Sequence, residues 1–449
     1  MQNLLYTLIL MLSLQFGLSG CADLNGSNNE QATTAEIPAL LKNPTYIGTA
    51  EEWESLLTSY DKAVAALKTD PNAIGPYLEL AQVYITEVRL TGNSEYYNAA
   101  AIQMLDKVLA HPNLDKENEF LALTLKSGVL LSLHQFADAL DAANKAYAIS
   151  QHNAQLIGAL VDAHVELGNY AEAVKYCDMM IQLRPDIRSY SRVSYLRQIH
   201  GDYPGAIEAM KMAVEAGLPG AESTEWARVI LGDLLLQTGD VKHAEICYTT
   251  ADGLRANYAY AKAGLGRLEK YKGNYAAAIK HTEAAITLLS DAAFVSQLAD
   301  IYALQGDAQK AAEIRNDVLD LLQEAEKNTE RSNKPTLHNG ARELSLAYLQ
   351  CGEFKQAYTL AKTDLGQRPN NIDANELAAF TAWHAGDLAA AKGYADKMLM
   401  TKVQNPVTLY KAALIYQKTG DTAKAATLMQ EAKKLYPGVD KEIAAFISK

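Results

Sequence analysis

The chain has 449 residues, of which 49% are hydrophobic and 21% charged, and its formal net charge is −12. This apolar content excludes wholesale disorder, and 27 Gly and 4 Cys are too few for a collagen-like chain or a disulfide scaffold. Because non-specific nucleic-acid binding requires a basic surface that displaces counterions, the negative charge predicts no nucleic-acid partner.

The N-terminus has the features of an export signal. Residues 4–16 form a mostly apolar run of 13 residues without charge, which is too short for a membrane span of about 20 residues. The tetrapeptide Leu18-Ser19-Gly20-Cys21 comes shortly after and resembles a bacterial lipobox. The resemblance implies cleavage before Cys21, acylation of Cys21, and a lipid-anchored membrane protein on the periplasmic or surface face of a bacterial cell envelope.

The first three residues depart from this pattern, because they contain no Lys or Arg, whereas signal peptides normally begin with positive charge. Two alternatives stay open: an ordinary secreted protein in which Cys21 is incidental, and an uncleaved anchor. Residues 22–50 show no apolar periodicity and begin with a stretch rich in Asn, Gly, Ser and Thr. They predict a flexible tether between the lipidated Cys21 and the folded part.

A short pattern recurs along the body of the chain: Gly, then Asn, Asp or Glu, then three variable residues and Ala. It begins at Gly168, Gly201, Gly239, Gly273, Gly306, Gly352, Gly386 and Gly420, with an imperfect copy, HQFADA, at His134. Successive copies lie 34, 33, 38, 34, 33, 46, 34 and 34 residues apart. The pattern and its period resemble the tetratricopeptide repeat, a pair of helices joined by a tight turn.

The resemblance implies an all-α fold, a right-handed α-solenoid of about ten tetratricopeptide helix-turn-helix repeats. Each Gly is expected to end a first helix in a left-handed conformation, and the next Asp or Asn to cap the second helix. The Ala five residues after each Gly allows the two helices to approach closely. Because one helix pair cannot bury its apolar face alone, stacking of neighbouring repeats provides the core.

We expect five segments: a signal peptide at 1–20, the lipidated Cys and tether at 21–50, the N-terminal part of the array at 51–325, a charged loop at 326–337, and the C-terminal part at 338–449. Residues 53–71 and 439–449 predict capping helices at the two ends. A charged insertion at 321–337 predicts an extended second helix followed by a loop. Three interpretations of the insertion stay open: tolerated surface length, a ligand-contacting loop, and a hinge between residues 52–325 and 336–449.

No motif predicts an active site. Phosphate-binding Gly-x-x-x-x-Gly-Lys-[Ser/Thr], His-Glu-x-x-His and Gly-x-Ser-x-Gly are absent, and Gly264-Leu265-Gly266 lacks the third Gly of a dinucleotide fingerprint. The nine His are scattered, and we expect His164 and His200, on neighbouring first helices, to be solvated or hydrogen-bonded. We therefore expect no enzyme, no cofactor and no metal site. The cysteines after the lipobox are expected to be buried, reduced thiols, with a reactive thiol as the alternative: Cys177, Cys247 and Cys351.

In this repeat family the first helices line a concave groove. The family register places nine candidate partner-binding residues there: Arg188, Tyr195, Trp226, Tyr260, Arg267, Lys270, Arg342, Phe380 and Trp383. Aromatic and Arg side chains dominate protein–protein hot spots, and a partly basic groove suits an extended peptide with carboxylates, or a helix. The alternative stays open that several of these aromatic side chains pack between adjacent first helices instead.

These features together predict a membrane-anchored scaffold that mediates protein–protein interactions in a bacterial cell-envelope assembly. A glycan- or peptide-capturing lipoprotein that serves a transporter is the alternative, because some outer-membrane lipoproteins of that class carry degenerate repeats of this kind. Self-association through the end repeats is a further alternative.

Overall fold

The computed structural model describes residues 37–41, 47–331 and 338–446. The predicted signal peptide and Cys21 lie outside these residues. The described part contains 22 α-helices and no strand, which confirms the predicted all-α class. None of these helices combines the length and the apolar character that crossing a membrane requires.

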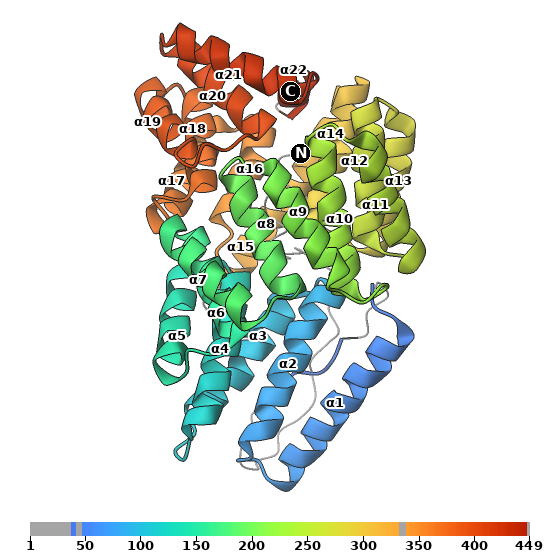
Figure 1. Ribbon diagram of the computed structural model, residues 1–449, viewed down its shortest axis with the longest axis vertical. Coiled ribbons are helices and arrows are strands. Elements are labelled where there is room, and N and C mark those ends of the chain that lie inside the picture. Colours follow the sequence, from blue (N-terminus) through green and yellow to red (C-terminus); the bar gives the residue numbers. More distant parts are fainter. Residues whose placement is uncertain (1–36, 42–46, 332–337, 447–449) are drawn as a thin grey trace.

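Within the described residues, ten antiparallel helix pairs follow one another (Figure 1). The first helices are α2 (Ile74–Thr91), α4 (Lys116–Ser132), α6 (Ala154–Glu166), α8 (Ile187–Ile199), α10 (Glu222–Gln237), α12 (Ala259–Lys272), α14 (Ala292–Gln305), α16 (Ala341–Gln350), α18 (Ile372–Ala385) and α20 (Pro406–Lys418). The second helices are α3 (Ser94–Leu109), α5 (Phe136–Ile149), α7 (Tyr170–Leu183), α9 (Tyr203–Glu215), α11 (Val241–Leu254), α13 (Tyr275–Leu288), α15 (Ala308–Arg331), α17 (Phe354–Gln367), α19 (Leu388–Met398) and α21 (Thr422–Leu435). Each first helix packs against the second helix of its own pair.

The recurring Gly-x-x-x-x-Ala pattern forms the turn of each pair. All eight Gly of the pattern have positive φ, between 76° and 99°, as expected where a first helix ends in the left-handed region. The eight Ala are buried, because the two helices of a pair meet at this position: Ala173, Ala206, Ala244, Ala278, Ala311, Ala357, Ala391 and Ala425. The predicted cap is present wherever the Gly is followed by Asp: Asp202, Asp240, Asp307, Asp387 and Asp421. The prediction is wrong for Asn, because the side chains of Asn169 and Asn274 form no cap hydrogen bond.

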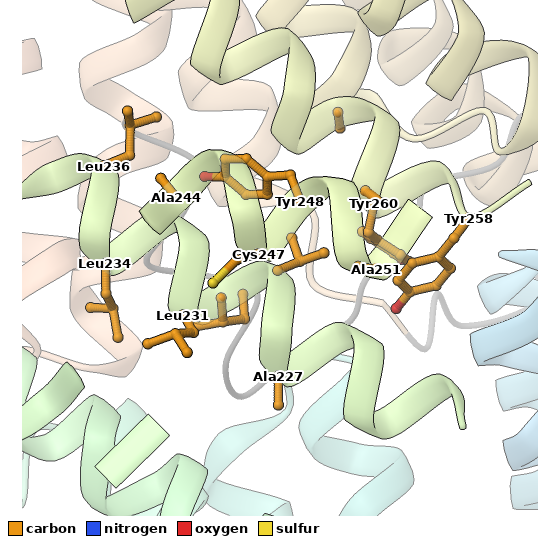
Figure 2. Packing of buried hydrophobic residues seen from close by; sticks show 14 of the residues in the cluster. Ala227, Leu231, Leu234, Leu236, Ala244, Cys247, Tyr248, Ala251, Tyr258 and Tyr260 are labelled. Carbon is orange, nitrogen blue, oxygen red and sulfur yellow. The ribbon is translucent and has the colours of Figure 1, made fainter. Parts of the chain in front are cut away.

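The pair α10–α11 shows how the core forms between repeats (Figure 2). The Tyr248 ring on α11 is fully buried and lies against two glycines. A Cβ at Gly232 would stand 2.7 Å from this ring, and a Cβ at Gly264 would stand 2.4 Å from it. Gly264 thus serves packing inside α12.

Both ends of the array carry a further helix. α1 (Ala50–Thr69) precedes the first pair, and α22 (Val439–Phe446) follows the last. α15 has 24 residues, whereas the other second helices have between 11 and 16. The insertion therefore begins as a helical extension, which continues to Arg331 within the segment expected to be a charged loop. Residues 332–337 lie outside the described part.

Of the predicted tether, the structure describes residues 37–41 and 47–50. Residues 37–41 lie against α1 and the first repeat, where tyrosine hydroxyls hydrogen-bond to their backbone. Tyr60 donates a hydrogen bond of 3.2 Å to the Pro38 carbonyl, and Tyr96 donates one of 2.7 Å to the Ala39 carbonyl. The Leu41 amide donates to the Tyr97 hydroxyl at 3.0 Å. This segment therefore differs from the flexible tether expected through residue 50.

The repeats near the C-terminus contact those near the N-terminus, and we call this contact the seam. Three turns inside repeats, at 133–135, 167–169 and 200–202, meet three connections between later repeats, at 338–340, 368–372 and 402–404. The Asn339 amide donates to the Leu133 carbonyl at 3.0 Å. A Cβ at Gly168 would lie 2.3 Å from the Asn370 backbone, and one at Gly201 would lie 2.6 Å from the Lys402 carbonyl oxygen.

A second contact involves the last helix. α22 packs against α14 and α20 (Figure 1). The buried Lys270 ammonium pairs with the Glu442 carboxylate at 3.0 Å, and Arg315 donates to the Ala445 carbonyl at 2.6 Å. The described repeats are therefore joined across about 130 to 205 residues of sequence as well as between neighbours.

Candidate functional site

The nine predicted partner-binding residues lie on first helices, but their exposure differs widely. Four are buried: Tyr195, Tyr260, Lys270 and Phe380. Four are partly buried: Trp226, Arg267, Arg342 and Trp383. Arg188, near the start of α8, is exposed.

Arg267 is held by an acidic residue of the preceding repeat. Its guanidinium donates to both carboxylate oxygens of Asp233, at 2.9 and 3.0 Å. The Tyr248 hydroxyl donates to the same carboxylate, and burial raises the pKa of Asp233 although Arg267 opposes that shift. The positive charge of Arg267 is thus compensated within the protein.

Similar pairs join other neighbouring first helices. Arg192 on α8 donates to both oxygens of Asp162 on α6, at 2.8 and 2.5 Å. Lys411 on α20 contacts Glu376 on α18 at 2.7 Å. These partners are 30 to 35 residues apart, close to one repeat. Charged residues of the first helices therefore form ion pairs between consecutive repeats.

The aromatic residues of α18 form a compact group. The Phe380 and Trp383 rings are stacked, with centroids 5.6 Å apart and planes 9° apart. The Lys411 ammonium lies 4.8 Å from the centroid of the Phe380 ring. Phe380 is buried in this group, whereas Trp383 retains partial exposure.

A buried charged cluster lies at the seam. Arg368 donates to Glu166 of the third repeat at 2.6 Å and to both oxygens of Asp364 at 2.8 and 2.9 Å. Burial raises the pKa of Glu166. It also raises the pKa of Asp373, the second residue of α18, to about 7, and the neighbouring Glu376 adds to the shift. This cluster fastens α6 to the α17–α18 connection.

A group of potential metal ligands lies at the other end of the seam, where His134 faces His338 and Glu343. Their ligand atoms all lie within 4.8 Å of one another, and no other such group occurs in the residues that the structure describes. Burial lowers the pKa of His134 to about 4, so its imidazole is neutral near pH 7, which is the form that binds metal ions.

The three described cysteines are free thiols. Cys177 and Cys247 are buried, as expected, and Cys351 is partly buried. Burial raises the pKa of Cys177 to about 12 and that of Cys247 and Cys351 to about 11. Because the thiolate is the reactive form, none of the three has the character of a reactive thiol.

Two segments, residues 130–199 and 407–438, match family models described as tetratricopeptide repeat. The chain is thus a protein with tetratricopeptide repeats, and its fold is an α-solenoid. No curated protein is significantly similar to it. Among solved structures, it is similar to the APC/C hetero-tetramer Cut9–Hcn1, with a TM-score of 0.43 and 15% identity over 85% of this chain and 69% of that chain. It is also similar to the human IFIT1 dimer with m7Gppp-AAAA, with a TM-score of 0.44 and 16% identity over 85% of this chain and 86% of that chain.

Sequence reasoning missed the pairs between first helices, although their signal was present. Asp162 and Asp233 occupy the same position of their repeats, and an Arg follows each of them in the next repeat, at Arg192 and Arg267. Opposite charges one repeat apart on the same helix face favour a pair. The seam gave no such signal, because its partners do not recur with the repeat.

Proposed function

We propose that this protein is a non-enzymatic scaffold that binds other proteins and is held at a bacterial membrane by lipid on Cys21. The tetratricopeptide repeats support the scaffold part, since stacked helix pairs offer an extended surface for protein partners. The proposed partner site rests on the difference in solvent exposure among the nine candidate residues. Only Arg188, Trp226, Arg267, Arg342 and Trp383 retain exposure.

We place the partner at the start of the first helices α8 and α10. Arg188 and Trp226 occupy the same position in consecutive repeats, and Arg188 is exposed while Trp226 is partly buried. A guanidinium and an indole at equivalent positions of consecutive repeats suit a peptide or helix that carries both carboxylates and an apolar side chain. Arg267 contributes less, because Asp233 already neutralises it.

The tether limits how far the repeats stand from the membrane. Sixteen residue steps separate Cys21 from Ile37 (37 − 21), the first described residue. A fully extended chain covers about 3.5 Å per residue, so this link reaches at most about 55 Å. A partner of the scaffold is therefore expected within the same envelope assembly, near the membrane surface.

The partner site is tested by pull-down from a solubilised bacterial envelope with the wild-type chain and two variants. We expect Trp226→Ala and Arg188→Glu each to lose the same captured protein. Trp53→Ala is the matched control, because Trp53 is a partly buried Trp on the terminal helix α1. Capture of background proteins alone, or equal capture by Trp226→Ala and wild type, contradicts the proposed site.

The anchor is tested separately by labelling with a radioactive fatty acid and by membrane fractionation. We expect Cys21→Ser to lose the label and to leave the membrane fraction. If Cys21→Ser stays in the membrane fraction, the anchor is not the lipid on Cys21. The scaffold proposal is untouched by that result, because the pull-down tests it independently.

A further inference from the structure

Three side chains meet where the second repeat contacts the eighth. His134 follows α4, whereas His338 precedes α16 and Glu343 lies in its first turn. The His134 Nδ1 atom lies 3.4 Å from Glu343 Oε1, and His338 Nε2 lies 3.9 Å from Glu343 Oε2. The two imidazole rings have centroids 4.8 Å apart. Residues about 200 positions apart therefore present two nitrogen ligands and one carboxylate to a common point.

The three side chains are shielded from water and incompletely paired. Their exposed fractions are 11% for His134, 10% for His338 and 18% for Glu343. Neither His338 Nε2 nor Glu343 Oε2 has a hydrogen-bond partner. Buried polar atoms are normally paired, so two such atoms that face each other indicate a missing positive partner.

His134 is also unusual for its place in the repeat. It stands where the eight regular copies have Gly, and it adopts φ 58°, in the left-handed region that favours Gly. The turn itself does not require a His, because the other turns function with Gly, although the buried imidazole also lies 5.5 Å from the Phe136 ring. A ligand role supplies one, since this backbone conformation carries the imidazole to Glu343 and to the Asn339 carbonyl, 3.3 Å from Nδ1.

We propose that His134, His338 and Glu343 form a structural zinc site that clips the seam. Zinc prefers imidazole nitrogen and carboxylate oxygen at about 2.0–2.2 Å in a tetrahedron, which separates neighbouring ligand atoms by about 3.4 Å. The separation of 3.4 Å between His134 Nδ1 and Glu343 Oε1 matches this value, whereas His338 Nε2 lies 3.9 Å from the other carboxylate oxygen, Oε2. The ligand atoms lie within 4.8 Å of one another, so the three side chains have to move closer together around the ion. The Asn339 carbonyl or a water molecule completes the tetrahedron. The metal then joins the second repeat to the start of the eighth.

The test uses the full chain, purified in detergent without a His tag, treated with chelator and titrated with Zn²⁺ alone against a competing indicator dye. We expect one Zn²⁺ per chain. His134→Gly and His338→Ala should each weaken binding at least about tenfold, since even loss of an outer-shell partner commonly weakens a site 10- to 100-fold. His152→Ala, at an exposed His between α5 and α6, is the matched control and should bind as wild type.

His134→Gly guards against a folding artefact, because it restores the residue that the other turns use and relieves the left-handed backbone. The seam itself supplies a second readout, since the Asn339 amide donates across it to the Leu133 carbonyl. Zn²⁺ should slow hydrogen exchange at this amide in the wild type and not in His134→Gly. Equal Zn²⁺ affinity in wild type, His134→Gly and His338→Ala would overturn the proposal, as would binding without any effect on exchange at Asn339.

Discussion

The seam makes a sharp prediction at Gly168. Substitution by Ala has two physical effects: a strained left-handed backbone at φ 76°, and a Cβ 2.3 Å from the Asn370 carbonyl carbon. The first effect costs about 1–2 kcal/mol. The second forces a local opening of the kind that overpacking causes, about 1–3 kcal/mol. Gly273→Ala is the matched control, because Gly273 has φ 79° and nothing lies within 4 Å of its Cβ position.

We therefore expect Gly168→Ala to lose roughly 2–5 kcal/mol of unfolding free energy and Gly273→Ala roughly 1–2 kcal/mol. Native-state hydrogen exchange locates the difference. The Ile372 amide is at the first position of α18, where a helix supplies no partner, and it donates to the Tyr170 hydroxyl at 2.8 Å across the seam. Its exchange should accelerate roughly 5- to 150-fold in Gly168→Ala, the equivalent of about 1–3 kcal/mol.

The control variant should leave the Ile372 amide unchanged, because Gly273 lies in the turn between α12 and α13 and away from the seam. Equal exchange of Ile372 in the two variants would refute the reasoning. It would mean that the third repeat does not depend on the α17–α18 connection. Equal denaturation midpoints would refute the steric part alone.

Three further predictions concern other contacts. Burial raises the pKa of Asp373 to about 7, so the folded state keeps a proton that the unfolded chain releases above about pH 4. The urea concentration at the denaturation midpoint should therefore fall as the pH rises from 4 to 7, and it should fall less in Asp373→Asn. Glu442→Ala leaves the buried Lys270 unpaired and should cost roughly 3–5 kcal/mol in urea denaturation, partly recovered by adding Lys270→Met. Tyr97→Phe should remove about 1 kcal/mol and accelerate exchange of the Leu41 amide.

The repeats could be predicted in detail because their signals are local. A Gly that ends a first helix and an Ala at the closest approach of the two helices lie within six residues and recur eight times, and an Asp caps the second helix in five of these copies. Each is a short-range requirement of backbone geometry or packing, so the sequence alone predicts the helix pairs and the capping helices at residues 53–71 and 439–449. The structure has α1 and α22 at these places.

The burial of the candidate partner residues could not be predicted in the same way. The family register places Tyr195, Lys270 and Phe380 on the first helices, but it contains no information on what lies opposite. Lys270 is buried because Glu442 comes back to it from 172 residues later. No period of the sequence links these two positions, since the pairing depends on how the entire array curves.

The metal-ligand group illustrates the same limit and one exception to it. No sequence pattern marks His338 and Glu343 as ligands, because His134 lies about 200 residues earlier in the chain. His134 itself is the exception, because the imperfect repeat HQFADA has His where every regular copy has Gly. A side chain that replaces Gly at a left-handed position needs a compensating reason. The His in place of Gly therefore indicates that position 134 has a special role, although only the structure shows which residues His134 faces.

The seam also bears on how a partner binds. In an open solenoid every first helix is available, but here Arg368 and the α17–α18 connection cover the end of α6 at Glu166 and the turn at Gly168. A partner that requires the covered part binds only those molecules in which the seam is open. Its apparent affinity is therefore its intrinsic affinity multiplied by the open fraction. A partner at Arg188 and Trp226 has no such requirement. The Gly168→Ala variant separates the two cases, because a weakened seam strengthens binding in the first case and leaves it unchanged in the second.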